Sequence, residues 1–186
     1  MKHFMHICSG INVTPLSMAL NLRPDLWNHH NERKEFEGTS HAGTSDIWVR
    51  YRDVAELGED YKKFSSEPHE SVWYPAYREL PMLRPIIFGL MAKCEAVQLG
   101  GVLITRIPPG GQVFPHVDKG WHPERYNMKV YVPLLSNPQC VNRVEDEYVV
   151  MNPGEAWYFN NTVEHEVINN GPTERVTLIV CMRVES

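Results

Sequence analysis

The sequence lacks any pair of closely spaced cysteines. Its four cysteines, Cys8, Cys94, Cys140 and Cys181, are scattered along the chain. A disulfide-stabilised secreted scaffold needs more cysteines for its size, and a structural zinc motif needs closely spaced ones. The cysteine pattern therefore argues against both classes and indicates reduced, mostly buried thiols in a cytoplasmic protein.

Long hydrophobic runs and basic tracts are also missing. No segment has the roughly 20 consecutive apolar residues that cross a bilayer, and the first residues contain no apolar stretch of signal-peptide length. Lys and Arg number 18 against 23 Asp and Glu, which gives a formal net charge of -5. We therefore expect a soluble, cytoplasmic protein that binds neither nucleic acid nor membranes. Its oligomeric state stays open.

The length and composition are those of a globular domain. A chain of 186 residues can bury a sizeable core and a pocket. Hydrophobic residues make up 42% of the chain, which excludes an intrinsically disordered protein. We expect one domain over residues 1–186, in which a mixed helix and strand segment over 1–95 braces a β-rich core over 96–186.

Residues 1–95 carry mixed signals. An amphipathic stretch over residues 16–22 stops before a proline, and alternating apolar and polar residues over 45–53 predict a strand. Apolar residues at helical spacing over 83–91 predict a helix. The charged run over 57–71 is expected to be a surface loop. These helices would brace one sheet from outside.

Residues 96–186 read as short strands separated by turns. About eight β-rich runs alternate with turn sequences such as PPGG, SNPQ and NNGPT. This even spacing is typical of a β-sandwich or barrel. The fold class predicted for the whole chain is therefore mainly β with bracing helices (α+β).

A histidine and an aspartate stand two positions apart in FPHVDKG, residues 114–120. Residues at i and i+2 of a strand point the same way, so His116 and Asp118 share a face. His165, which follows the apolar run AWYF, is the candidate third ligand. Two imidazoles and a carboxylate form the facial triad of non-heme Fe(II) oxygenases, with open positions for other ligands.

Arg175 begins the last β-rich run, ten residues after His165. An arginine that points inward from a strand is costly unless an anion meets it, and its guanidinium suits a carboxylate. The distal carboxylate of 2-oxoglutarate is such an anion. Thr105, in a neighbouring run, could add a hydroxyl donor.

These motifs resemble the 2-oxoglutarate/Fe(II)-dependent dioxygenases, and within them the aspartyl/asparaginyl β-hydroxylase-like branch. The resemblance covers residues 96–184 and rests on PPGGQVFPHVD, GEAWYFNNTVEHEVIN and ERVTLIV, with a weaker match over 41–51. It implies a double-stranded β-helix (jelly roll, cupin-like) with Fe(II) bound by His116, Asp118 and His165. It also implies that Arg175 and Thr105 hold 2-oxoglutarate, and that O2 is consumed.

The sequence departs from that branch after Asp118. The segment KGWHPERYNMKVYV is longer and places Asn127 and Lys129 where basic or histidine residues often contact the co-substrate. The resemblance implies hydroxylation of an amino-acid side chain, free or in a peptide or protein, with release of succinate and CO2. The candidate substrate contacts are Arg50, whose strand face could equally be solvated, and Trp121 and Arg125.

Several readings compete with these roles. A cupin-like metal enzyme that does not use 2-oxoglutarate would share the ligands but would not need Arg175. A non-catalytic binding module of the same fold is a third reading. Most other histidines are expected at the surface, although His41 suits a structural or substrate-side role. The candidates for orienting the ligands are Glu164, Glu166, Asn160 and Asn161.

Overall fold

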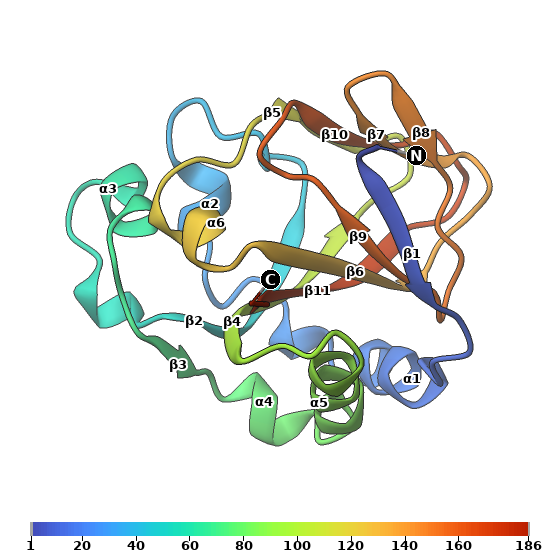
Figure 1. The fold of residues 1–186 in the computed structure, drawn as a ribbon, viewed down its shortest axis with the longest axis horizontal. Helices are drawn as coiled ribbons and strands as arrows, with labels where there is room; N and C mark the ends of the chain where they lie inside the picture. The colour runs from blue at the N-terminus through green and yellow to red at the C-terminus, as the bar shows by residue number, and fades with distance from the viewer. Residues whose placement is uncertain (1, 186) are drawn as a thin grey trace.

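Two antiparallel sheets face each other in the computed structural model, which describes residues 2–185 (Figure 1). The strands of the seven-stranded sheet are, in spatial order, β1 (Phe4–Cys8), β9 (Ala156–Phe159), β6 (Met128–Leu135), β11 (Arg175–Arg183), β4 (Gln98–Ile107), β2 (Ser45–Arg52) and β3 (Ser71–Trp73). The strands of the four-stranded sheet are β5 (Gln112–His116), β10 (His165–Asn169), β7 (Cys140–Val144) and β8 (Glu147–Val149). The predicted double-stranded β-helix is therefore confirmed, including the eight strands expected after residue 96.

Three of the helices cover the outer face of the seven-stranded sheet. The helices are α1 (Thr14–Leu22), α2 (Glu32–Glu35), α3 (Tyr61–Ser66), α4 (Ala76–Glu79), α5 (Leu83–Lys93) and α6 (Trp121–Arg125), with 3-10 turns at Pro24–Leu26 and Val54–Glu56. Figure 1 shows α1, α4 and α5 together below this sheet, opposite the smaller sheet. The helices α1 and α5 bury their apolar faces there, so they brace the sheet as predicted.

Strand β11 explains how one sheet serves both a core and a site. Its residues alternate between two faces, as in any strand. Val176, Leu178 and Val180 pack with the helices on the outer side. Ile179 and Cys181 point between the two sheets, where Arg175 also reaches across to the smaller sheet. The inner face of this strand therefore supplies polar and apolar groups to the interior.

The first part of the chain does more than brace the sheet. Strand β1 pairs with β9, and β2 pairs with β4, so both belong to the same sheet as the later strands. The surface loop predicted over 57–71 is wrong, because α3 and the start of β3 lie there. Asp60 begins α3 by accepting hydrogen bonds from the backbone N–H groups of Lys62 and Lys63, and Phe64 is buried beneath it.

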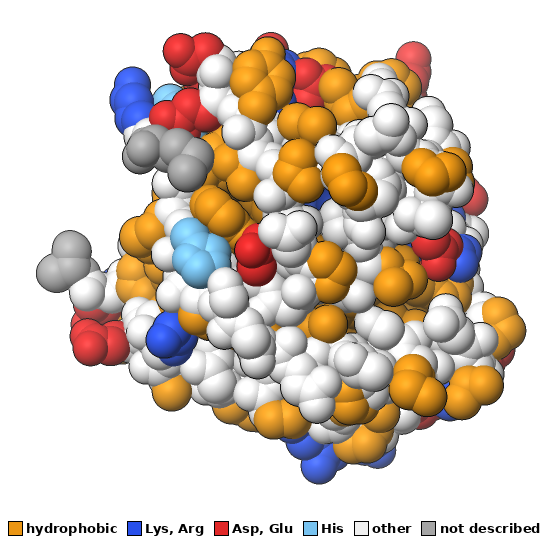
Figure 2. All heavy atoms as spheres, turned by 90° about the vertical axis from the view of Figure 1, so that its right-hand side faces the viewer, with side chains coloured by type: hydrophobic (Ala, Val, Ile, Leu, Met, Phe, Trp, Pro, Cys, Tyr) orange, Lys and Arg blue, Asp and Glu red, His pale blue; other side chains and the backbone are white. Residues whose placement is uncertain are grey.

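Surface hydrophobic residues are scattered. Figure 2 shows the face that is on the right in Figure 1, where β1 and α1 lie, with hydrophobic side chains spread over it singly and in small groups, among uncharged side chains and some charged ones. Met5, Met18 and Leu22 are among the exposed apolar residues. Within residues 2–185, no helix has both the length and the apolar character needed to span a bilayer.

Replacing Gly100 with alanine is expected to destabilise the protein by about 1–3 kcal/mol. A Cβ built at Gly100 in β4 lies 2.6 Å from Cγ of Tyr126, whose ring packs on the bare backbone. The matched control is Gly89→Ala in the middle of α5, where an added Cβ meets nothing within 4 Å. That change is expected to stabilise by about 0.5–1 kcal/mol. Urea unfolding of both variants measures the difference, and equal stabilities would contradict this packing.

Candidate metal centre

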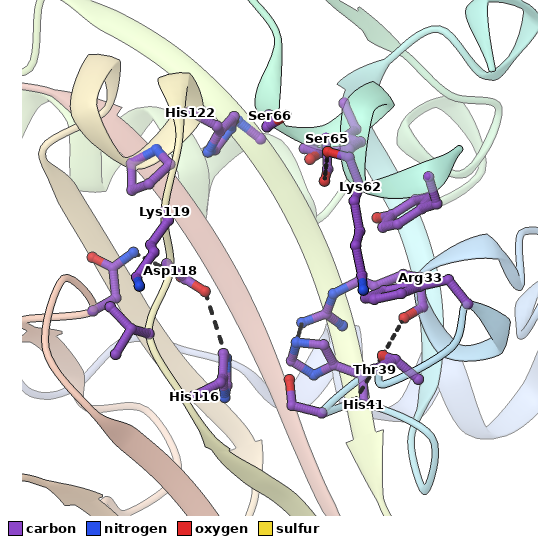
Figure 3. Close-up of a pocket in the computed structure, with 18 of the residues that line it drawn as sticks. Arg33, Thr39, His41, Lys62, Ser65, Ser66, His116, Asp118, Lys119 and His122 are labelled. Atoms are coloured by element: carbon purple, nitrogen blue, oxygen red, sulfur yellow. Dashed lines mark hydrogen bonds and ion pairs between the residues drawn. The ribbon is translucent and has the colours of Figure 1, made fainter. Parts of the chain in front are cut away.

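A cavity of about 1010 Å³ opens beside the end of strand β5. His116 and Asp118 lie on one wall, and Arg33, His41 and Lys62 lie on the facing wall (Figure 3). Cavities that hold small ligands are usually about 300–1,000 Å³, so this one has room for a substrate as well as a co-substrate.

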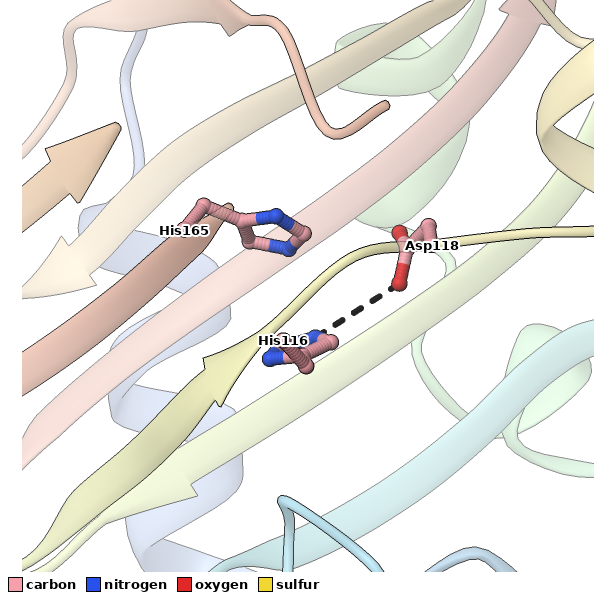
Figure 4. Close-up of side chains that lie close together, drawn as sticks. All are labelled: His116, Asp118 and His165. Carbon is pink, nitrogen blue, oxygen red and sulfur yellow. Dashed lines mark ion pairs between the residues drawn. The ribbon is translucent and has the colours of Figure 1, made fainter. Parts of the chain in front are cut away.

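The three predicted ligands come together at this cavity. Strand β5 ends at His116, Asp118 follows two residues later, and β10 begins at His165, directly opposite His116 in the sheet. One ligand atom from each residue lies within 4.8 Å of the others (Figure 4). This is a separation that one metal ion can bridge. The pairing of two strands far apart in sequence therefore builds the cluster.

Both imidazoles are oriented with one nitrogen free. His116 Nδ1 lies 2.7 Å from the Phe114 carbonyl oxygen, and His165 Nδ1 lies 3.0 Å from the Val163 carbonyl oxygen. A carbonyl can only accept, so each Nδ1 carries the hydrogen and each Nε2 keeps its lone pair. His165 Nε2 is buried and has no partner in the described chain. A metal ion would satisfy it, and the backbone carbonyls would fix the ring orientation.

Asp118 is held by two donors on one oxygen. Lys129 Nζ and Asn161 Nδ2 each donate to Oδ2 over 2.7 Å, while Oδ1 lies 3.5 Å from His116 Nε2. Burial by itself raises the pKa of this carboxyl, but the Lys129 ammonium outweighs it and holds the pKa well below its usual range. Asp118 is therefore ionised, with Oδ1 turned toward the histidines.

Arg175, the predicted contact for the distal carboxylate of 2-oxoglutarate, lies in the interior between the two sheets. Only 2% of the residue is exposed, and Nη2 donates to Asn142 Oδ1 over 3.0 Å. Its Nε has no partner, and among residues 2–185 no carboxylate lies within ion-pair distance of it. Thr177 Oγ1, the next inward side chain on β11, is likewise buried without a partner. These unpaired groups fit a carboxylate.

The other predicted co-substrate contacts are less well placed. Thr105 does not line the cavity, and its hydroxyl already donates to Asp46 Oδ1 over 2.7 Å. Lys129 is used by Asp118. Asn127 is exposed, and its side chain exchanges two hydrogen bonds with the backbone of Val184. Asn127 therefore binds the residue that follows β11, and its contact with the co-substrate stays a prediction.

None of the predicted substrate contacts lines the cavity. Arg50 donates to the Gly100 carbonyl and lies over the ring of Trp73, and Arg125 donates to Gln98. Trp121 packs against His69, with ring centroids 5.0 Å apart. These three side chains therefore contact other parts of the chain outside the cavity lining, and a role for them in substrate binding stays a prediction.

Of the four residues expected to orient the metal ligands, Asn161 contacts one of the ligands, and the other three bind elsewhere. Asn161 holds Asp118 through its side chain and also accepts the Asp118 backbone N–H over 3.0 Å. Glu164 and Glu166 pair instead with Arg143, on the other side of the strand. Asn160 accepts hydrogen bonds from Thr162 in the turn before β10.

The structure adds residues that sequence reasoning missed. Arg33 and Lys62 line the cavity, although their segments look like ordinary charged surface. His41, which was expected in a structural or substrate-side role, lies against His116, with ring centroids 5.0 Å apart, and burial lowers its pKa well below the usual value. We predicted that most of the other histidines lie at the surface. This is wrong for His3 and His69, which are only 7% and 8% exposed.

His122 is a cavity residue but not part of the metal cluster. Its Nε2 accepts the Gly101 backbone N–H over 3.3 Å, and its ring stacks on His69 with centroids 5.8 Å apart. Burial lowers the pKa of His122 to about 3, and burial also lowers the pKa of His165 to about 4. Both rings are therefore neutral at physiological pH.

Acidification is expected to destabilise the metal-free protein. In the unfolded chain the two histidines take up protons near pH 6.5, whereas in the folded chain they stay neutral until about pH 4 or below. Stability is therefore lost as pH falls through this window, by about 2 kcal/mol for each ring between pH 7 and pH 4.5. Denaturant unfolding of His122→Gln should show a shallower pH dependence. An unchanged dependence would contradict a neutral buried His122.

Comparison with known proteins agrees with this geometry. Residues 25–184 match the family model described as Aspartyl/Asparaginyl beta-hydroxylase. No curated protein matches the chain. Because the family match covers most of the chain, it includes both the cavity wall and the candidate metal ligands.

Solved structures share the fold at low identity. The viral collagen prolyl hydroxylase vCPH from Paramecium Bursaria Chlorella virus-1, solved as its 2OG complex, is 10% identical with a TM-score of 0.57, over 98% of this chain and 97% of that one. IDO from Bacillus thuringiensis is 12% identical with a TM-score of 0.55, over 100% and 94%. An oxidoreductase of the 2OG-Fe(II) oxygenase family from Burkholderia pseudomallei is 11% identical with a TM-score of 0.54, over 75% and 67%.

These identities are low enough that the likeness shows the fold alone. The family itself is shown by the match over residues 25–184. The chain therefore belongs to the aspartyl/asparaginyl β-hydroxylase family, a family of 2-oxoglutarate- and Fe(II)-dependent hydroxylases.

Proposed function

We propose that this protein hydroxylates an unactivated carbon of an amino-acid side chain, free or in a peptide or protein, with release of succinate and CO2. The observation that carries the proposal is the cluster of His116, Asp118 and His165 at the cavity, with ligand atoms within 4.8 Å of one another. Two imidazoles and one carboxylate on one side of a metal leave positions for a co-substrate and O2.

The donor set fits Fe(II). His116 and His165 would each bind it through Nε2, and Asp118 through Oδ1, since Oδ2 already accepts from Lys129 and Asn161. When bound, Fe(II) and 2-oxoglutarate would supply the oxidation: one oxygen atom of O2 would enter succinate as the co-substrate loses CO2, and the other would enter the C–H bond of the substrate.

The chain itself supplies orientation and charge. Lys129 keeps the Asp118 carboxylate ionised, and with Asn161 it fixes the direction of Oδ1. Arg175 and Thr177 offer the buried donors for the distal carboxylate of 2-oxoglutarate. A dry interior strengthens these contacts, because charges interact more strongly away from water.

The unpaired Arg175 separates this proposal from a cupin-like enzyme without 2-oxoglutarate. Such an enzyme would leave a buried cation with no counterion, which is a costly arrangement. Arg175 donates only to the neutral Asn142 in the described chain. The co-substrate carboxylate provides the missing partner.

A turnover assay tests the proposal. Protein reconstituted with Fe(II) would receive 2-oxoglutarate, O2 and a panel of L-amino acids and short peptides, with succinate and products followed by mass spectrometry. The proposal expects succinate that requires 2-oxoglutarate, together with a product one oxygen atom heavier than its substrate. Substrate oxidation that proceeds without 2-oxoglutarate would instead establish the cupin-type reading.

A further inference from the structure

The cavity is basic although the chain is acidic. In the whole chain 18 Lys and Arg are outnumbered by 23 Asp and Glu. The balance is reversed in the cavity lining, where the basic side chains are Arg33, Lys62, Lys63, Lys119 and Lys129 and the acidic ones are Asp60, Glu67 and Asp118. A local charge opposite to that of the chain favours an anionic occupant.

The acidic residues of the lining are already engaged. Asp60 accepts the first N–H groups of α3, and Asp118 pairs with Lys129. Glu67 lies 3.8 Å from Lys63 and 3.7 Å from Arg52. Over residues 2–185, Lys62 and Lys119 take part in no ion pair with any of these groups.

The free cations stand on facing walls. In Figure 3, Lys62 extends from α3 toward Arg33, while Lys119 lies beside Asp118 on the other side of the cavity. Both lysines are exposed, whereas only 13% of the Arg33 side chain is exposed. We call these two lysines, together with Arg33, whose guanidinium forms an ion pair with Asp46, the basic rim.

The wall beside Arg33 offers donors rather than acceptors. Arg33 Nη1 donates to Asp46 Oδ2 over 2.8 Å, and Nη2 lies 3.1 Å from His41 Nε2. A guanidinium cannot accept, so His41 Nε2 is the acceptor and its hydrogen is on Nδ1. That Nδ1 is buried without a partner. A carboxylate, which only accepts, matches this wall.

We infer that the primary substrate carries a carboxylate that binds at the basic rim while its reacting carbon faces the metal ligands. The inference rests on the proposed function. The co-substrate does not need this rim, because its distal carboxylate fits the buried Arg175, which is outside the cavity lining. The carboxylate belongs either to a free amino acid or to an acidic residue of a peptide, since the cavity of about 1010 Å³ admits both.

Calorimetric titration under argon tests the inference without turnover. The protein is loaded with Mn(II) in place of Fe(II), and 2-oxoglutarate binding is measured first. Three probes follow: N-acetyl-L-glutamate, the blocked peptide acetyl-Gly-Glu-Gly-amide, and its neutral counterpart acetyl-Gly-Gln-Gly-amide. The variants are Lys62→Gln and Lys119→Gln. The matched control is Lys63→Gln, because the Lys63 amine is already near Glu67.

The expected result is that an acidic probe binds at least about tenfold tighter than the neutral peptide. Each rim variant should weaken that binding by about five- to tenfold, the control by less than about twofold, and added salt should weaken it further. The tighter of the two acids identifies the source of the carboxylate. Equal binding of acidic and neutral probes, rim variants that match the wild type, or no binding of either acid at millimolar concentration would overturn the inference.

Failure of the proposed function gives a different pattern. In that case 2-oxoglutarate does not bind in the first titration, and the acidic probes are then titrated into metal-free protein. If binding of the acidic probes is still weakened by Lys62→Gln and Lys119→Gln, the basic rim is an anion site even though the proposed function has failed. If 2-oxoglutarate binds normally but neither acid binds, the inference about the basic rim is contradicted and the proposed function is not.

Discussion

Replacing His165 with alanine is expected to abolish tight metal binding and to lower succinate release more than about a thousandfold. The imidazole is 3% exposed, and its Nε2 has no protein partner, so the described chain gives this nitrogen no other role. The fold should survive, because losing one buried polar side chain typically costs about 1–3 kcal/mol. Metal content after dialysis and succinate release measure the two effects.

A matched control is His29→Ala, which removes an exposed histidine outside the cavity. It should retain both metal content and succinate release. If His165→Ala kept one tightly bound metal per chain, while folding like the wild type, the assignment of this residue as a ligand would be contradicted.

Replacing Arg175 with methionine is expected to weaken 2-oxoglutarate binding by about a hundredfold to a thousandfold, with little loss of stability. The two effects separate because Arg175 is buried with no counterion in the described chain, so its charge costs stability until an anion binds. Loss of its hydrogen bond to Asn142 costs about 1–3 kcal/mol, and removal of the unpaired charge offsets this. Calorimetry and thermal unfolding of the metal-free protein give both quantities.

Arg106→Met serves as the control, since Arg106 lies on the other face of neighbouring β4, over the ring of Trp27. It should leave 2-oxoglutarate affinity unchanged. A sharp loss of stability in Arg175→Met with normal co-substrate affinity would show that the arginine is structural and would remove the main support for 2-oxoglutarate.

The candidate metal cluster and the β-rich core could be predicted because their signals are local. The HxD spacing places two side chains on one side of a strand end, and alternating strands with regular turns define the sheets. The contact between His165 and His116 then follows from pairing β10 with β5. The inward direction of Arg175 follows from strand alternation, and its contact with Asn142 across the two sheets agrees with that expectation.

The cavity wall could not be predicted because it depends on tertiary packing. Arg33 and Lys62 come from charged segments with no motif, and they reach the cavity because α2 and α3 contact β2, through Arg33 with Asp46 and Phe64 with Tyr51. Arg50 is the opposite case, a residue that was predicted at the site and does not reach it. Its strand was predicted correctly, but pairing with β3 places the guanidinium over Trp73 instead of the cavity.

The N-terminal strand and Asn127 show the same limit. Strand β1 pairs with β9, far away along the chain, and a short run of mixed residues gives no local sign of that partner. Asn127 occupies a position that the family resemblance assigns to the co-substrate, yet it binds the backbone of Val184. Resemblance alone does not reveal such an exchange of partners.

The most direct test of the proposed site is an anaerobic titration followed by visible absorption. Fe(II) and then 2-oxoglutarate are added to metal-free wild-type, His165→Ala and Arg175→Met protein. The proposed site predicts a weak charge-transfer band in the wild type, none in His165→Ala, and a band in Arg175→Met that needs far more 2-oxoglutarate. A wild type that binds one metal tightly but gives no band with 2-oxoglutarate would contradict it.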